Sequence, residues 1–282
     1  MTKFIATLAT NLAYDDLKIF LKTIVLWSKE NYPTIYLYAD NLLPELEYPG
    51  RLVRIAALNK YTSYTRRQME QMPSSLYSSL WLEFQAEKLN LLDWVFQSEP
   101  TAENIGVFYF DADICFLGPL PQIDSDALVG LSPHMIRDED EAKFGKYNAG
   151  FLWMKTRRAV AAWREACPKS RFFEQAALEC FDLAEWSGKV HMFPVQHNYG
   201  WWRLWQGKRP VKDLMAEWSM QRSAKHSGII VQNEPLCSIH THWKERFDRS
   251  THTFNMMVIK QLEVLAPFHT PAQKVLDIVT NV

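Results

Sequence analysis

A chain of 282 residues, 48% hydrophobic and 13% aromatic, is large and apolar enough to bury a substantial core, as one large α/β domain or two small ones. Its formal net charge of −1 argues against wholesale nucleic-acid binding, although the stretch 200–250 carries nine Lys and Arg against five Asp and Glu. That stretch also holds five of the eleven Trp residues. The four cysteines lack the spacing of a metal site, so we expect them to be reduced.

The apolar part of the N-terminus is too short for a signal peptide, and no later run approaches the length that spans a membrane. We therefore expect a cytoplasmic protein whose contact with a membrane is at most peripheral. No internal repeat or Gly/Ser-rich linker divides the chain, which favours a single domain.

Strand and helix patterns alternate along the first 120 residues, which predicts a doubly wound, mostly parallel sheet covered by helices. Apolar β-prone runs predict strands at 4–8, 34–39 and 51–58, and a fourth that begins at Val107. Apolar residues at helical spacing predict helices at 14–31 and 75–96. We expect a polar, Tyr-rich loop at 59–73.

Beyond Gly118 the pattern is less regular. Strands are predicted at 127–131 and 149–154, with a charged loop at 137–146 between them. Helices are predicted at 156–166 and 172–184. Over 254–279 we expect two short amphipathic helices, broken by Pro267 and Pro271 and packed against the domain.

Two carboxylates one residue apart, Asp111 and Asp113, end the apolar run that begins at Val107. Such a strand is buried on both faces and carries ligand groups at its carboxyl end. Paired carboxylates are hard oxygen ligands for Mn²⁺ or Mg²⁺, and such an ion neutralises the diphosphate of a nucleotide. An isolated Asp-x-Asp more often marks an acidic turn, so the other motifs must decide between the two interpretations.

Seven short motifs occur in order along the chain. They are Thr7 to Tyr14, Lys88, Phe110-Asp111-Ala112-Asp113, Tyr147-Asn148-Ala149-Gly150, Glu174-Gln175, Phe193-Pro194 to Asn198, and Ile239-His240-Thr241-His242. Each is weak alone, but their succession over residues 4–250 resembles the GT-A glycosyltransferases, most closely the family-8 retaining enzymes that include glycogenin and bacterial galactosyltransferases. The resemblance implies a GT-A fold in a single domain, with a helical C-terminal tail.

The resemblance also implies a role for each motif. Thr10, Asn11 and Tyr14 would contact the nucleoside, Lys88 the donor phosphates, and Asn148 the donor sugar. Asp111, Ala112 and Asp113 would form the metal motif. Glu174 and Gln175 would stabilise the sugar cation, and Asn198 would line the sugar or acceptor pocket. The last strand would deliver a His as third metal ligand. His240 fits that motif, and His242, on the same face of a strand, is the alternative. The family's Gly and Lys after this His are replaced here by Trp243 and Arg246, which leaves Lys244 as the phosphate candidate.

We therefore predict a metal-dependent glycosyltransferase that moves a sugar from a nucleotide-diphosphate donor, expected to be a UDP-sugar, to an acceptor hydroxyl with retention. The metal would be Mn²⁺ or Mg²⁺. A surface glycan or lipid-linked saccharide is the first choice of acceptor, ahead of a protein side chain or a modified nucleic-acid base. Stacking faces and positive charge favour an anionic acceptor beside Trp201, Trp202, Arg203, Trp205, Lys208 and Arg209.

The predicted organisation is a glycosyltransferase domain over 1–250, with a nucleotide-sugar half at 1–120 and an acceptor half at 121–250, followed by a helical extension at 251–282. Simpler interpretations stay open: Lys88 could be a solvated helix edge, Asn148 could begin a turn, and Glu174 could merely favour a helix start. A haloacid-dehalogenase-like phosphatase also ends a strand in Asp-x-Asp, but needs Thr or Val where this chain has Cys115. A catalytically silent sugar-nucleotide-binding protein is the last alternative.

Overall fold

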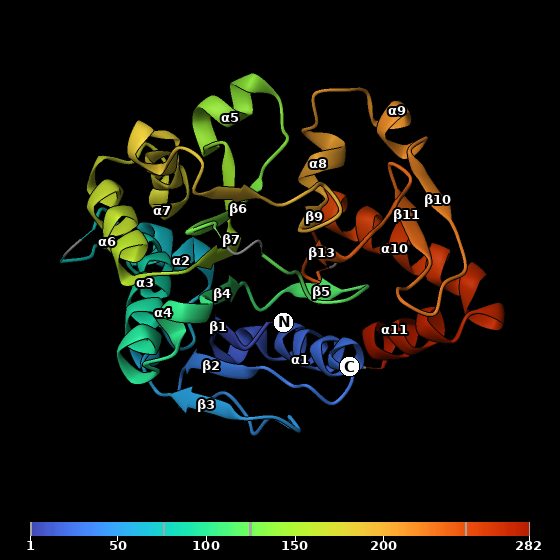
Figure 1. Cartoon of the computed structure of the whole chain (residues 1–282), viewed down its shortest axis with the longest axis horizontal. Helices are drawn as coiled ribbons and strands as arrows, with labels where there is room; N and C mark the ends of the chain where they lie inside the picture. The colour runs from blue at the N-terminus through green and yellow to red at the C-terminus, as the bar shows by residue number, and fades with distance from the viewer. Residues whose placement is uncertain (1, 76, 124–125, 246, 282) are drawn as a thin grey trace.

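The computed structural model describes residues 2–75, 77–123, 126–245 and 247–281. Its centre is a seven-stranded sheet of order β3-β2-β1-β4-β7-β6-β8 (Figure 1). The strands are β1 (Phe4–Ala9), β2 (Thr34–Ala39), β3 (Leu52–Ile55), β4 (Val107–Phe110), β6 (Val129–Pro133), β7 (Tyr147–Met154) and β8 (Val190–Met192). β7 runs antiparallel to both of its neighbours, and all other pairs are parallel. This confirms the predicted, mostly parallel α/β sheet.

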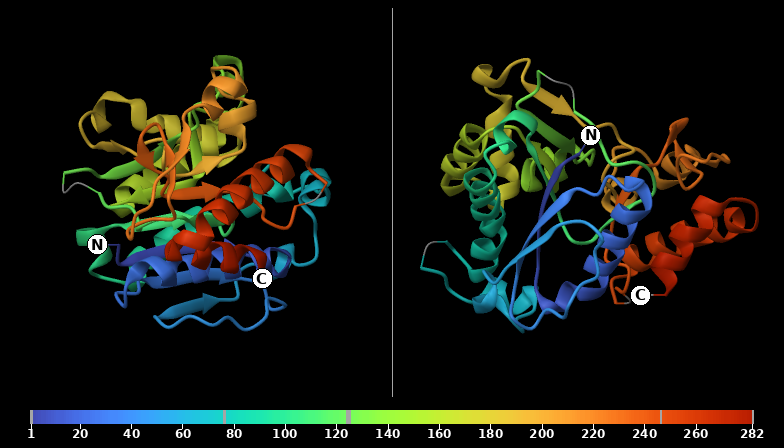
Figure 2. Two further views of the ribbon diagram at one scale, coloured as in Figure 1. Left: turned by 90° about the vertical axis from the view of Figure 1, so that its right-hand side faces the viewer. Right: turned by 60° about the horizontal axis from the view of Figure 1, so that its bottom comes forward.

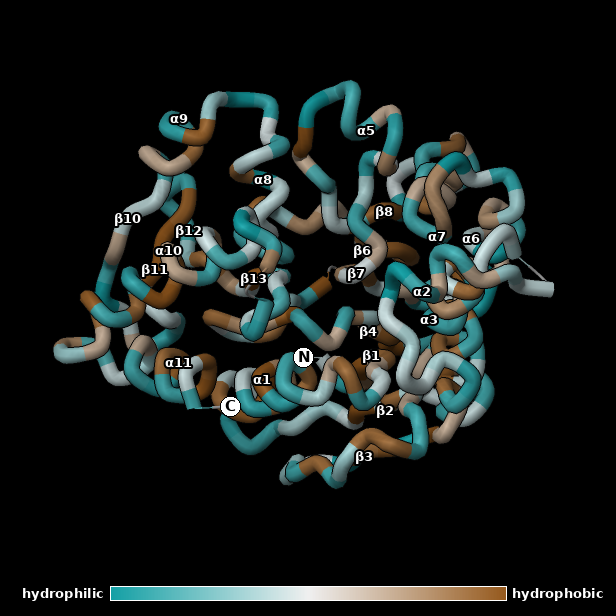
Figure 3. The backbone as a smooth tube through the Cα atoms, turned by 180° about the vertical axis from the view of Figure 1, so that it is seen from behind, coloured by the Kyte–Doolittle hydropathy of each residue, from teal (hydrophilic) through white to brown (hydrophobic). Residues whose placement is uncertain are grey.

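Both faces of the sheet are covered, which explains why β4 is apolar throughout. Phe108 and Phe110 belong to the core on one face, whereas Val107 and Tyr109 belong to the core on the other, because successive side chains alternate. The first face packs against α1 (Tyr14–Ser28), and the second against α3 (Leu80–Ser98) and α6 (Arg157–Ala166). In Figure 3 the hydrophobic residues, coloured brown, are concentrated along these strands and the inner helices.

Two smaller sheets complete the fold. The first contains β5 (Ile114–Phe116), β13 (Ser238–His240) and β9 (Tyr199–Gly200), in that order, with β13 antiparallel to β5 and parallel to β9. Its register places His240 opposite Ile114, directly after the Asp-x-Asp motif. The second is antiparallel and contains β10 (Trp218–Met220), β11 (Ile229–Val231) and β12 (Glu234–Pro235). The short helices α8 (Trp202–Trp205) and α9 (Val211–Met215) connect the two sheets.

The C-terminal helices α10 (Arg249–Leu265) and α11 (Thr270–Thr280) pack back onto the domain. Their buried apolar residues join the same core as α1, and α11 lies beside α1 (Figures 1 and 2). Pro267 separates the helices as predicted, but Pro271 lies in the first turn of α11, a position that proline tolerates well. None of the helices in the described part of the chain is long and apolar enough to cross a membrane.

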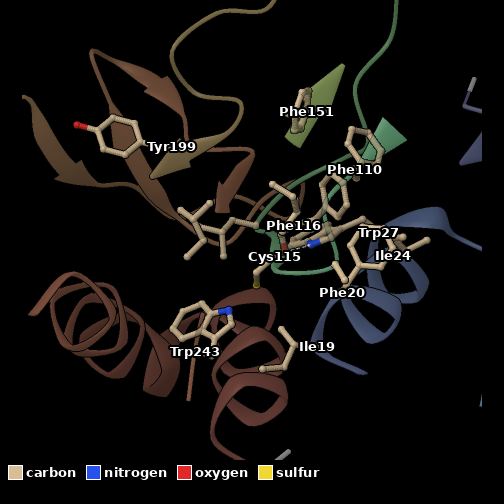
Figure 4. Close-up of a cluster of buried hydrophobic side chains, with 14 of the residues drawn as sticks. Ile19, Phe20, Ile24, Trp27, Phe110, Cys115, Phe116, Phe151, Tyr199 and Trp243 are labelled. Atoms are coloured by element: carbon tan, nitrogen blue, oxygen red, sulfur yellow. Dashed lines mark hydrogen bonds between the residues drawn. The ribbon is translucent and has the colours of Figure 1, made fainter. Parts of the chain in front are cut away.

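Trp243 and Cys115 lie in this core, between α10 and α1 (Figure 4). All four cysteines are free, as expected: Cys115, Cys167, Cys180 and Cys237. Burial raises the pKa of the Cys115 thiol above its ordinary range, so it remains a neutral core group.

Three predicted elements are wrong. The loop at 59–73 contains α2 (Arg66–Gln71), which begins with a capping box between Thr65 and Gln68. The charged loop at 137–146 contains α5 (Asp138–Phe144), whose four acidic first-turn residues favour a helix and which ends at Gly145 with φ of 99°. The helix at 172–184 is only the short α7 (Phe173–Ala176), followed by a 3₁₀ helix (Ala177–Asp182). A further short helix, α4 (Ala102–Ile105), precedes β4.

Candidate metal centre

Asp111, Asp113 and His240 converge at the carboxyl end of β4. Each offers one ligand atom, and these atoms all lie within 4.8 Å of one another. Nε2 of His240 is 3.0 Å from a carboxylate oxygen of Asp113 and 3.7 Å from one of Asp111. The fold thus brings together the two predicted carboxylates and the histidine that the motif favours.

The hydrogen bonds of Asn198 determine which nitrogen of His240 is free. The backbone N–H of Gly150 donates to Oδ1 of Asn148 at 3.0 Å, and Nδ2 of Asn198 donates to the same oxygen at 3.0 Å. Oδ1 of Asn198 therefore faces His240 and accepts a hydrogen bond of 2.8 Å from Nδ1. In the neutral imidazole the Nδ1 proton is used in this way, so the Nε2 lone pair points at the carboxylates.

This arrangement fits a divalent cation. A lone pair 3.0 Å from a carboxylate oxygen is repulsive unless a cation or a proton lies between them. Two ligands on adjacent corners around an octahedral Mg²⁺, each about 2.1 Å from it, lie about 3.0 Å apart. Two carboxylates and one imidazole also suit Mn²⁺. A Cβ at Gly150 would overlap both Oδ2 of Asp111 and Cε1 of His240, so only glycine keeps this space open.

A buried ion pair of Lys88 and Glu174 stands beside the centre. Nζ of Lys88 lies 2.7 Å from Glu174 and 3.6 Å from Asp111, and the two side chains of the pair are 2% and 4% exposed. Burial lowers the pKa of Lys88, but the charges of Asp111 and Glu174 outweigh it, and the pKa is raised above its ordinary value. Lys88 therefore stays charged and offsets both carboxylates. The interpretation of Lys88 as a solvated helix edge is wrong.

Asn148 and Gln175 contact each other beside Gly150. Asn148 is part of β7, so the interpretation that it begins a turn is also wrong. Its Nδ2 donates to Oε1 of Gln175 at 3.4 Å, and Nε2 of Gln175 donates to the carbonyl of Phe144 at 2.8 Å. These contacts fix both amides near the metal centre.

The predicted nucleoside contacts follow β1, at the same edge of the sheet. Thr10 is buried, and the N–H of Asn11 donates to Oδ2 of Asp40 at 3.1 Å. Oδ1 of Asn11 is buried without a hydrogen-bond partner among the described residues. The hydroxyl of Tyr14 donates to the carbonyl of Glu45 at 3.4 Å. Ala112, in the metal motif, is buried.

His242 and Lys244 lie just beyond β13, which ends at His240. The expectation that His242 lies on this strand is therefore wrong, and its side chain is 63% exposed. Nδ1 of His242 pairs with Asp16 at 2.9 Å, and Nε2 is 3.5 Å from Asp113. Asp113 first, and then Asp16, raise the pKa of His242 to about 10. Lys244 is exposed.

In the basic, Trp-rich segment, the first residues face the interior and the later ones are exposed. The rings of Trp202 and His240 form a T-shaped pair, with ring centroids 5.1 Å apart. Arg203 is buried, and burial lowers its pKa to about 10. Lys208 and Arg209 are exposed and paired with acidic side chains: Lys208 with Asp138 and Glu141, and Arg209 with Glu217. Arg203, Lys208 and Arg209 line a cavity of 350 Å³ together with Tyr199 and Glu217.

Sequence reasoning missed several residues that support the site. Asp40, the residue directly after β2, could have been found by its position at the carboxyl edge of the sheet. Tyr109 donates from its hydroxyl to Asp111 at 2.8 Å, and Ser132 accepts from Asn198 at 3.0 Å. Tyr109 lies two residues before Asp111, on the same face of the extended chain, so the alternation of side chains could have revealed this contact. No local pattern marks the contact of Ser132 with Asn198, because it joins residues 66 positions apart.

No protein-family model and no curated protein sequence matches this chain. Solved structures do. Galactosyltransferase LgtC, in complex with donor and acceptor sugar analogs, superposes with a TM-score of 0.53 and 12% identity over 99% of this chain and 95% of LgtC. An active-site mutant of LgtC gives a TM-score of 0.51 and 15% identity, over 90% of this chain and 93% of that one.

The apo-form glycosyltransferase GlyE of Streptococcus pneumoniae TIGR4 gives a TM-score of 0.53 and 13% identity, over 88% of this chain and 57% of GlyE. At identities this low, the superpositions establish the fold and leave the activity open. The chain therefore has the GT-A fold that its motifs predict, and shares it with the glycosyltransferases LgtC and GlyE.

Proposed function

We propose that this protein is a metal-dependent glycosyltransferase that uses a nucleotide-diphosphate sugar, with a UDP-sugar as the first candidate. The centre formed by Asp111, Asp113 and His240 carries the proposal, because a histidine lone pair and two carboxylates meet where a GT-A sheet binds its ligand. The fold shared with LgtC, whose structure contains donor and acceptor sugar analogs, supports sugar transfer.

Asp111, Asp113 and His240 would hold Mn²⁺ or Mg²⁺, which when bound withdraws negative charge from the departing diphosphate. Lys88 adds positive potential at the same point, and its bond to Glu174 keeps it in place as charge develops. Lys244, exposed next to the last strand, is the candidate for a direct phosphate contact. Asn11 offers its free Oδ1 to the nucleoside, beside Thr10.

The donor sugar would lie against Asn148, Glu174 and Gln175, and its transfer would proceed with retention. Lys88 lies 2.7 Å from Glu174 and offsets part of its charge, which lowers its strength as a nucleophile. The remaining negative potential of Glu174 would stabilise the sugar cation. No covalent intermediate is needed if the acceptor hydroxyl attacks from the face that the diphosphate leaves. Gln175 and Asn148 would orient the sugar hydroxyls.

The acceptor would be a hydroxyl of a surface glycan or a lipid-linked saccharide, bound along residues 201–209. Trp202 stands against His240, so an acceptor stacked on this segment would be close to the reacting centre. Lys208 and Arg209 border the cavity that follows. Their charge favours an anionic group on the acceptor.

A screen of nucleotide sugars for metal-dependent hydrolysis, read by release of the nucleoside diphosphate, tests this function. Activity should disappear in chelator and return with Mn²⁺ or Mg²⁺. Asp113→Asn should keep the circular-dichroism spectrum and lower turnover on the order of 100-fold or more, while Asp277→Asn, on α11, should change nothing. Full activity in chelator or in Asp113→Asn would refute a metal-dependent enzyme, and nucleotide binding without turnover would indicate a silent binding protein.

A further inference from the structure

Asn198 lies in the connection between β8 and β9 and has no exposed surface. Its amide contacts three side chains, accepting from His240 and donating to Asn148 and Ser132. Its backbone N–H donates to Oγ of Ser238 at 3.0 Å, and its φ of 57° is one that asparagine tolerates better than most residues. An enclosed side chain of this kind contacts no sugar directly. Its chemistry acts through His240.

Arg203, on α8, is only 3% exposed, and its acceptors among the described residues are all neutral. Nη1 donates to the carbonyls of Val195 and His197, and Nη2 donates to the carbonyl of Pro133 at 2.7 Å and to Oγ of Ser132 at 3.3 Å. All four acceptors belong to two short segments, 132–133 and 195–197. The first segment contains Ser132, which accepts from the Asn198 amide, and the second leads directly into Asn198. One guanidinium therefore joins Ser132 to the backbone that carries Asn198.

We propose that Arg203 is a positioning residue for the metal centre, acting through Ser132 and Asn198 to set the ring of His240. Arg203 holds the end of β6 against the connection that leads into β9. Ser132 and Asn148 then fix the Asn198 amide, and its oxygen fixes the proton on Nδ1 of His240. Nε2 is thereby presented to Asp111 and Asp113 before any cation arrives. This inference rests on the metal centre in the proposed function.

Only arginine can make this set of contacts. Its planar guanidinium presents two nitrogens in a fixed fork, whereas lysine has a single nitrogen and reaches a subset of the four acceptors. Asn148 still accepts from the Asn198 amide, but without the fork Ser132 and the segment that leads into Asn198 are free to shift. The amide oxygen then holds the Nδ1 proton of His240 less firmly, and Nε2 is presented less well to the cation. Removing partners that orient a ligand in this way weakens metal affinity by about 10–100-fold.

The test measures the affinity for Mn²⁺ alone, by the resonance signal of free Mn²⁺, with thermal unfolding as a check of the fold. We expect Arg203→Lys and Arg203→Met to bind Mn²⁺ about 10–100-fold more weakly than the wild type. Arg54→Met is the matched control. Arg54 also donates to three backbone carbonyls, those of Asp40, Leu43 and Pro44. It lies on β3, which β2 and β1 separate from β4 and the metal motif, so its loss should leave Mn²⁺ affinity unchanged.

A double-mutant cycle separates positioning from general destabilisation. If Arg203 acts through Asn198, then Arg203→Met should cause no further loss of Mn²⁺ affinity in an Asn198→Ala background. If the Arg203 variants do not fold, Ser132→Ala cuts the same link and should weaken Mn²⁺ binding in its place. Wild-type affinity in any of the folded variants, or additive losses in the cycle, would overturn the role of Arg203. Failure of the wild type to bind Mn²⁺ would refute the metal centre itself.

Discussion

The backbone carbonyl of Gly150 accepts a hydrogen bond of 2.8 Å from the N–H of Asp111. This contact holds Gly150 close to the Asp111 carboxylate. Its φ is not in the left-handed region, so the backbone conformation does not demand glycine here. The close approach does, because a Cβ would overlap Asp111 and His240.

Gly150→Ala should therefore displace a metal ligand and weaken Mn²⁺ binding on the order of 100-fold, measured by calorimetry. Gly118→Ala is the matched control, because its Cβ would lie 3.4 Å from the nearest atom, the Cβ of His226. Unchanged Mn²⁺ affinity in Gly150→Ala would contradict a cation between these side chains.

His240 and His242 should differ in their effect on metal binding. His240→Ala removes the Nε2 that is 3.0 Å from Asp113, so its Mn²⁺ affinity should fall by about 10–100-fold or more. His242→Ala removes an exposed partner of Asp16 and should change the affinity far less. Calorimetry with the nucleoside diphosphate present compares the two. The reverse ranking would assign the third ligand to His242.

Much of this site could be predicted, because its main parts follow local patterns. The apolar run of β4 predicts a buried strand, and Asp111 and Asp113 must then lie at its carboxyl end. His240 follows from the order of the motifs. The charged α5 was missed because it has no apolar periodicity, and it is stabilised instead by first-turn carboxylates and Gly145.

The supporting contacts could not be predicted, because they join distant parts of the chain. Asn198 and His240 are 42 residues apart, and only the pairing of β9 with β13 brings them together. Arg203 belongs to a basic, Trp-rich stretch that suggests a surface. Its guanidinium nevertheless turns inward, because Pro133, Val195 and His197 present carbonyls that need donors.

The buried ion pair of Lys88 should be sensitive to the loss of one partner. Lys88→Met leaves Glu174 and Asp111 without their counter-charge and should lower the free energy of unfolding by about 3–5 kcal/mol. Adding Glu174→Gln should recover part of that loss. Urea denaturation measures both, with Lys146→Met as control, because its exposed pair with Asp182 contributes about 0–1 kcal/mol. Equal losses for Lys88 and Lys146 would contradict this.

Stability should fall as the pH falls from about 6.5 to about 4. Burial lowers the pKa of His134 and of His197 to about 4. Below pH 6.5 the two histidines therefore bind protons in the unfolded chain but not in the folded chain. The free energy of unfolding then falls as the pH falls, by at most about 1.4 kcal/mol per pH unit for each histidine. Below about 4 the folded state is protonated too, and these two groups cause no further loss.

His197→Phe should reduce this acid sensitivity, because the ring of His197 already packs near Phe151 and Phe193 and its Nδ1 has no partner among the described side chains. Urea titrations at several pH values would show a shallower slope than in the wild type. His252→Gln, at an exposed position on α10, should follow the wild type. An unchanged slope in His197→Phe would mean that other groups govern the acid loss.

The last prediction concerns the acceptor. Lys208 and Arg209 border the cavity beside Tyr199, and each is exposed and paired with carboxylates. Exchanging both for Ser should raise the Michaelis constant for an anionic acceptor, because two positive charges are lost from its path. The effect should shrink at high salt, since exposed charges are screened over about 8 Å at physiological ionic strength.

Hydrolysis of the donor without acceptor should stay nearly unchanged, because neither side chain reaches the metal centre through a described contact. Lys260→Ser combined with Lys274→Ser, two exposed changes on α10 and α11, controls for the loss of two positive charges. Lys208→Arg with Arg209→Lys should restore the Michaelis constant if charge alone matters. If the Ser variant damages donor hydrolysis as much as transfer, then residues 201–209 support the donor site or the fold, and the acceptor must bind elsewhere.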